Sequence, residues 1–170
     1  MLGLNFYPHQ DVYHTAFRAL ALARITGGIR DDAYRILDYF TIFPFDLPII
    51  RHRGALKKRL AKQFESVKPY KWYASPSSTF LQLAEYQTIA LDMLRERNLI
   101  EQKEVKLTEI FTIDATLIKE FDKFVERMSP VIDYILGLNA EYGLYGEGGL
   151  KDRSTLMTFK YDVKNNAHVD

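Results

Sequence analysis

The stretch from Asp31 to Phe43 constrains the fold most, because its residues from Ala33 onward are apolar except for three polar side chains. Arg35, Asp38 and Thr41 recur every third residue. On a helix this spacing gives one narrow polar stripe, with apolar surface on the other sides. A helix that is apolar on most sides has to be enclosed by other elements. We therefore predict a central helix over 31–43, with the rest of the domain packed around it.

Asp38 lies inside this helix and needs a partner if it is buried, because an unpaired buried carboxylate is strongly unfavourable. Arg35 is three residues away, and Arg18 is within reach from the preceding helix. Local spacing places no second acid or nucleophile beside Asp38. We therefore interpret Arg18, Arg35 and Asp38 as structural residues and favour a buried ion pair over a catalytic acid.

The two ends of the central helix are predicted from the residues that flank it. Asp31 or Asp32 is expected to accept the N-cap hydrogen bond. Pro44 cannot continue the helix, so residues 43–50 (FPFDLPII) should leave it as an extended apolar strip. An exposed apolar strip is a candidate contact surface for a partner protein. The partner-binding candidates are Phe43, Phe45, Leu47, Ile49, Ile50 and, further along, Trp72.

Two further helices have clear sequence signals. The first covers about 10–26, counts Phe17 among its core residues and is stopped by Gly27. The second starts after Ser75 as the cap, with proline in its first turn, and covers about 76–97. Two short apolar runs then follow, separated by four polar residues, Glu101 to Glu104, which predicts a hairpin with a polar tip.

Three helices closed by a hairpin are the pattern of a winged helix-turn-helix, here with helices over 31–43, 54–65 and 76–97. The predicted fold class is therefore mostly α, with a winged-helix-like core and additional N- and C-terminal helices. Residues 1–110 would form the N-terminal helix and this core. Residues 111–170 would form a helical extension, with a helix over 114–138, a glycine-rich loop over 143–149 and a short strand over 157–163, packed on the same domain.

A basic segment follows the apolar strip. Between Arg51 and Tyr73 there are eight Lys or Arg residues and one acid, and residues 55–65 have the spacing of an amphipathic helix. Tyr70, Trp72 and Tyr73 near its end are suited to stacking, so the segment is a candidate nucleic-acid contact; the alternative is a solvated helix face. The predicted contacts would be to the phosphate backbone, since the helix over 76–97 is too acidic for the major groove. The candidate residues are Arg51, Arg53, Lys57, Lys58, Arg59, Lys62, Lys68 and Lys71.

The remaining composition argues against several function classes. The chain has no cysteine, and its four histidines are scattered without metal-ligand spacing, so we expect no metal and no cofactor. The sequence contains no nucleophile signature, which leaves an enzyme on a helical scaffold as the last-ranked class. It also contains neither a signal peptide nor an apolar run long enough to cross a membrane, so a cytoplasmic protein is expected.

The segments Tyr13-His14, Phe17-Arg18, RILDYF at 35–40 and FPF at 43–45 resemble a known family. The likeness covers about residues 7–110. It is to the middle component of bacterial ABC-three-component conflict systems, the group that includes the small subunit of Lamassu anti-phage systems. The resemblance implies a non-enzymatic adaptor between an SMC-like ABC ATPase and a toxic effector such as a nuclease, with double-stranded DNA reached through the complex. The alternative is a stand-alone winged-helix DNA-binding regulator.

Overall fold

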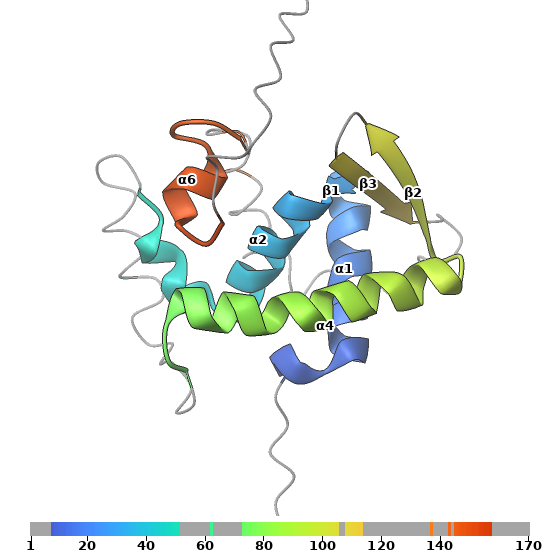
Figure 1. The fold of residues 1–170 in the computed structure, drawn as a ribbon, viewed down its shortest axis with the longest axis horizontal. Coiled ribbons are helices and arrows are strands. Elements are labelled where there is room, and N and C mark those ends of the chain that lie inside the picture. The colour runs from blue at the N-terminus through green and yellow to red at the C-terminus, as the bar shows by residue number, and fades with distance from the viewer. Residues whose placement is uncertain are drawn as a thin grey trace, which may run out of the picture.

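The computed structural model describes residues 8–51, 62, 73–105, 108–113, 137, 143 and 145–157 of the 170-residue chain. This part of the protein is mostly helical, as predicted, and it also contains a small sheet (Figure 1). The elements follow in the order η1 (Pro8–Gln10), α1 (Val12–Thr26), β1 (Ile29–Arg30), α2 (Asp31–Ile42), η2 (Pro44–Ile49), α4 (Pro76–Glu96), β2 (Ile100–Val105), β3 (Thr108–Ile113) and α6 (Leu150–Ser154).

Helix α1 has a well-defined cap at each end. The side chain of Asp11 accepts hydrogen bonds from the backbone N–H groups of Tyr13 and His14, at 2.8 and 3.1 Å. At the other end Gly27 adopts the left-handed conformation, with φ of 67°, and its N–H donates to the carbonyl of Arg24. The predicted stop at Gly27 is confirmed, and the chain continues directly into β1.

The second half of helix α1 is enclosed, because every residue from Arg18 to Ala23 is buried. Four alanines on α1 are buried, which lets neighbouring elements approach its backbone closely. Phe17 was expected in the core, and this is wrong, since the side chain is 47% exposed. It lies one turn after the exposed Tyr13, on the outer face of the helix.

Helix α2 covers the predicted stretch, but it starts differently from the prediction. Its N-cap is Arg30, and no side chain makes a cap hydrogen bond there. The expected capping role of Asp31 or Asp32 is therefore wrong. β1 pairs with β3 as far as Arg30, so the helix begins directly after the strand and both aspartates lie in its first turn. There they face the positive end of the helix dipole.

The segment after α2 is a 3-10 helix, η2, so the predicted extended strip is wrong. Proline fixes φ near the helical value, which suits the first position of a tight turn. The turn directs Phe43, Leu47 and Ile50 into the core, where all three are 0% exposed. Phe45 and Ile49 are partly buried and pack against the same core. In this conformation the segment is therefore part of the core and does not offer an exposed apolar surface.

The sheet has three antiparallel strands in the order β1-β3-β2. The predicted hairpin is present, with Ile100 opposite Ile113 and Val105 opposite Thr108. The predicted position of the hairpin tip is wrong, because residues 101–104 lie within β2 and the last pair of the hairpin is Val105 with Thr108. Strand β1 was not predicted, since two residues are too short to show a period.

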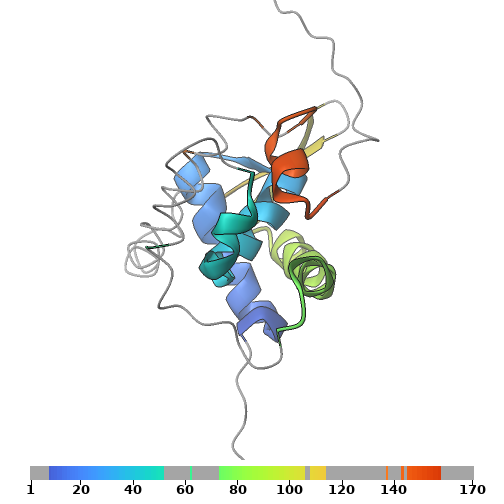
Figure 2. The same ribbon diagram turned by 90° about the vertical axis from the view of Figure 1, so that its left-hand side faces the viewer.

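Helix α4 lies across α1 and α2 at the edge of the molecule (Figures 1 and 2). As predicted, it starts with proline after the cap Ser75, whose hydroxyl accepts from the N–H of Ser78 at 3.2 Å. Of the predicted helix over 54–65, only Lys62 is described, and it is helical and exposed. The predicted helix over 114–138 and strand over 157–163 lie outside the described residues, apart from Gly137 and Met157. Among the helices described, none is long and apolar enough to cross a membrane.

We expect Gly27→Ala to lower the free energy of unfolding by about 1 kcal/mol, because an L side chain at this φ is strained even though nothing lies near its Cβ position. Gly27→Asn should cost less, since asparagine tolerates the left-handed region. Urea unfolding of the three proteins measures both effects. Equal stability of the alanine variant and the wild type would show that the cap contributes nothing.

Candidate functional site

The buried carboxylate of Asp38 lies where α1, α2 and α4 meet. Arg18 from α1 donates from Nε to Asp38 Oδ1 at 2.5 Å and from Nη2 to Oδ2 at 3.3 Å. Gln87 from α4 donates to Oδ2 at 3.0 Å. Arg18 is 5% exposed, and Asp38 and Gln87 are both 0% exposed. Arg18 also donates to Thr15 Oγ1 at 2.9 Å, so one network links all three helices.

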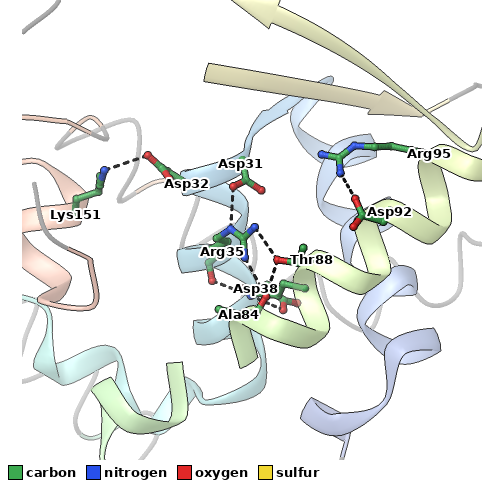
Figure 3. Close-up of polar contacts among 10 residues, drawn as sticks. Asp31, Asp32, Arg35, Asp38, Ala84, Thr88, Asp92, Arg95 and Lys151 are labelled. Carbon is green, nitrogen blue, oxygen red and sulfur yellow. Dashed lines mark hydrogen bonds and ion pairs between the residues drawn. The ribbon is translucent and has the colours of Figure 1, made fainter. Parts of the chain in front are cut away.

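Arg35, the other partner considered for Asp38, has different contacts (Figure 3). Its Nε lies 2.8 Å from Asp31 Oδ2, one helical turn earlier. Its Nη1 donates to the carbonyl of Ala84 at 3.1 Å, and its Nη2 donates to Thr88 Oγ1 at 3.2 Å. Because Arg35 and Asp38 both bond residues of α4, this part of the polar stripe of α2 faces another helix. Thr41, the third residue of the stripe, donates to the carbonyl of Leu37 on its own helix.

Gln87 is the member of this network that the sequence analysis missed. It is fully buried and also donates to the backbone carbonyl of Arg35 at 3.2 Å. The signal was available, because Gln87 follows Leu83 and precedes Ala90 and Leu91 on the apolar face of α4. A polar residue at the centre of an apolar stripe requires a buried partner.

A second polar cluster lies where η2 meets α2. The hydroxyls of Tyr39 and Tyr73 both donate to Asp46 Oδ2 and lie 3.1 Å from each other. Burial raises the pKa of Asp46, and the two tyrosine hydrogen bonds oppose that rise. Burial followed by the hydrogen bond to Asp46 raises the pKa of each tyrosine. Both hydroxyls therefore stay protonated at neutral pH and act as donors that hold η2 in place.

Comparison with known proteins shows the family of the chain. The family model of the ABC-three component (ABC-3C) system Middle Component 5 matches residues 4–162. The chain belongs to this family. The resemblance found in the sequence is confirmed, and the match extends it over the C-terminal region. No curated protein and no solved structure matched the chain. As a middle component, the protein acts together with the other components of such a conflict system.

In this middle component, the C-terminal segment 143–157 is tied to the core by ionic contacts. Lys151 Nζ lies 3.0 Å from Asp32 Oδ2 on α2 (Figure 3). Arg51 forms an ion pair with Asp152, whose pKa is lowered mainly by the backbone N–H of Gly148 and further by Arg51. The Lys151–Asp32 pair joins α6 to the first turn of α2, and the Arg51–Asp152 pair joins it to the chain just after η2.

Of the basic candidate residues, the structure describes Arg51 and Lys62. Arg51, at the start of the basic segment, is engaged within the chain, since it also donates to the carbonyl of Asp152 at 2.5 Å. Lys62 is exposed. The others lie outside the described residues: Arg53, Lys57, Lys58, Arg59, Lys68 and Lys71, together with the partner candidate Trp72. In the part of the middle component that the structure describes, no group of three potential metal ligands comes together.

We expect Asp38→Ala to lower the free energy of unfolding by about 3 kcal/mol, because it removes the carboxylate opposite the buried guanidinium of Arg18. Asp92→Ala is the matched control: Asp92 pairs with Arg95 at 2.6 Å but is exposed, so its loss should cost less than about 1 kcal/mol. Thermal or denaturant unfolding compares the two. Equal effects of both variants would contradict a stabilising role for the buried pair.

His9 should make stability depend on pH. Burial, followed by the nearby charge of Arg18, lowers its pKa from 6.5 to about 4. Between these values the unfolded chain binds a proton at His9 and the folded chain does not, so the free energy of unfolding should fall as pH decreases through this window. His9→Phe should show a smaller decrease over the same range in denaturant unfolding. Parallel pH profiles of the two proteins would contradict the assignment.

Proposed function

We propose that this middle component is a non-catalytic adaptor that links an SMC-like ABC ATPase to a toxic effector, such as a nuclease, in a Lamassu-type anti-phage complex. The observation that carries the proposal is the family match over residues 4–162. The buried polar groups support it. The Asp38 and Asp46 clusters each join elements of the fold, so a structural role explains why these carboxylates are buried.

We further propose that the core is a winged helix in which α1, α2 and α4 are the three helices and the β2-β3 hairpin is the wing. The support is the order of the elements, with the short β1 between the first two helices and a sheet in the order β1-β3-β2. This assignment places α4 at the third-helix position, which is the usual DNA-reading helix of such folds. It replaces the predicted helix over 54–65 with α1.

DNA contact, on this proposal, is made by the basic segment and not by α4. The outer face of α4 carries Glu85, Asp92 and Glu96, all exposed, which would repel the phosphate backbone. The basic segment supplies cations without any base-reading geometry. The expected binding is therefore independent of DNA sequence, sensitive to salt and stronger within the complex than for the isolated chain.

The adaptor proposal is tested by co-expressing the tagged middle component with the neighbouring ATPase and effector components and measuring the stoichiometry of the purified complex. We expect the middle component to be required for the ATPase and effector to co-purify. Direct association of those two in its absence would overturn the linking role.

The alternative function, a stand-alone winged-helix DNA-binding regulator, is favoured by the combination of the element order with the basic segment. It predicts tight DNA binding by the isolated protein. An electrophoretic or fluorescence titration at increasing salt separates the two functions. Tight, steeply salt-dependent binding by the isolated chain, together with no component of the system in the purified material, would establish the regulator.

Reversing the charge of Lys57, Lys58 and Lys62 to Glu should abolish DNA association by the complex while the melting temperature stays unchanged. Substituting the same residues by Gln is the matched control for charge removal without reversal. It should weaken binding less and reduce its salt dependence. Unchanged DNA binding by the Glu variant would show that the segment is only a solvated face.

A further inference from the structure

The outward side of α4 forms a continuous exposed face. In Figure 1 the helix lies across the front of the molecule, and in Figure 2 it is seen end-on at one edge. Leu81, Glu85, Ile89, Asp92 and Glu96 recur every three or four residues and are all exposed, so they share this side. The opposite side of α4 is buried against the core.

Two large apolar side chains are exposed on this acidic face. Leu81 is 72% exposed and Ile89 is 45% exposed, although the buried side of the same helix has its own apolar residues. The two side chains are two helical turns apart, about 12 Å along the axis. Single exposed apolar residues are common, but here two share one face with three carboxylates, and Glu85 lies between them, so this face offers apolar contact area and negative charge side by side. This is the composition of an interface.

The acids on this face are largely available to a partner. Asp92 is paired with Arg95 on the same helix at 2.6 Å (Figure 3). Glu85 and Glu96 form no ion pair with other residues that the structure describes. A cationic partner would therefore gain new charge pairs here without breaking the contacts that hold the core together.

We propose that the outer face of α4 is the docking surface for a basic amphipathic helix supplied by another subunit of the three-component complex. This inference rests on the proposed adaptor function. Apolar residues at i, i+4 and i+7 of such a helix would contact both Leu81 and Ile89. Lysines or arginines flanking that stripe would pair with Glu85 and Glu96. Charge complementarity selects a basic protein segment and disfavours DNA at this face.

The chain offers a matched control on another helix. Tyr13 and Phe17 are exposed apolar residues one turn apart on α1, at 63% and 47%, and the exposed residues beside them include no acid. Substituting both by lysine makes the same chemical change as substituting Leu81 and Ile89 by lysine. The melting temperature of each double variant is measured beside its binding, so that a loss of binding is separated from a loss of stability.

The experiment compares capture of the other two components by wild type, Leu81→Lys/Ile89→Lys, Glu85→Lys/Glu96→Lys and Tyr13→Lys/Phe17→Lys, with affinities measured at low and high salt. Both α4 double variants should weaken binding by about tenfold or more, and the α1 variant should bind as wild type does. The glutamate variant should also lose much of the salt dependence of binding.

The outcomes separate this inference from the adaptor function. If wild type captures the other components and both α4 variants do so equally well, the α4 surface is wrong and the adaptor function stands. If wild type captures neither component, both are wrong. A photo-cross-linker at Leu81 identifies the occupant, and a basic helical segment of another subunit is expected. A cross-link to a second copy of this chain, to DNA or to an acidic segment would overturn the proposal.

Discussion

The buried carboxylate of Asp38 is the constraint on which the arrangement of the three main helices depends. It accepts from Arg18 on α1 and from Gln87 on α4 while lying on α2 itself. A buried charge is tolerated only when its partners are in place, so each helix is held in one rotation about its axis and one position along it. Apolar packing alone would accept several such arrangements. We therefore assign this network a role in specifying the fold as well as in stabilising it.

The inward position of Gln87 also determines what α4 presents to solvent. Once Gln87 faces Asp38, the residues on the other side of the helix are placed outward, and these include Leu81, Glu85 and Ile89. The contacts of Arg35 with Ala84 and Thr88 hold the same helix along its edge. A rigid helix with a defined outer face is the kind of element that a partner can bind without a large ordering cost.

The features that were predicted correctly from the sequence are those that neighbouring residues in the chain determine. Helices α2 and α4 were predicted from their periodicity. The C-terminal end of α1 was predicted from Gly27 and the N-terminal end of α4 from Ser75, because these signals lie within a few residues of the helix end that they determine. The features that were missed depend on distant partners. Strand β1 exists because it pairs with β3, and η2 is compact because its apolar side chains find a core that the local sequence does not show. The Arg18–Asp38 pair could be predicted because an unpaired acid in an apolar helix requires a cation. Gln87 could be recognised as a buried polar residue from its place on the apolar face of α4, but its bond to Asp38 on another helix could not.

The charge distribution agrees with the proposed adaptor function. The formal net charge is only +1, but two regions of the chain carry opposite charge: the basic stretch 51–71 and the acidic outer face of α4. Within the described structure, Arg51 at the start of the basic stretch is paired with Asp152, so α6 is anchored beside the point where that stretch begins. On the proposed function, the basic stretch would contact an acidic partner such as DNA and the outer face of α4 a basic protein segment. Like charges would then keep each partner from binding at the other's site.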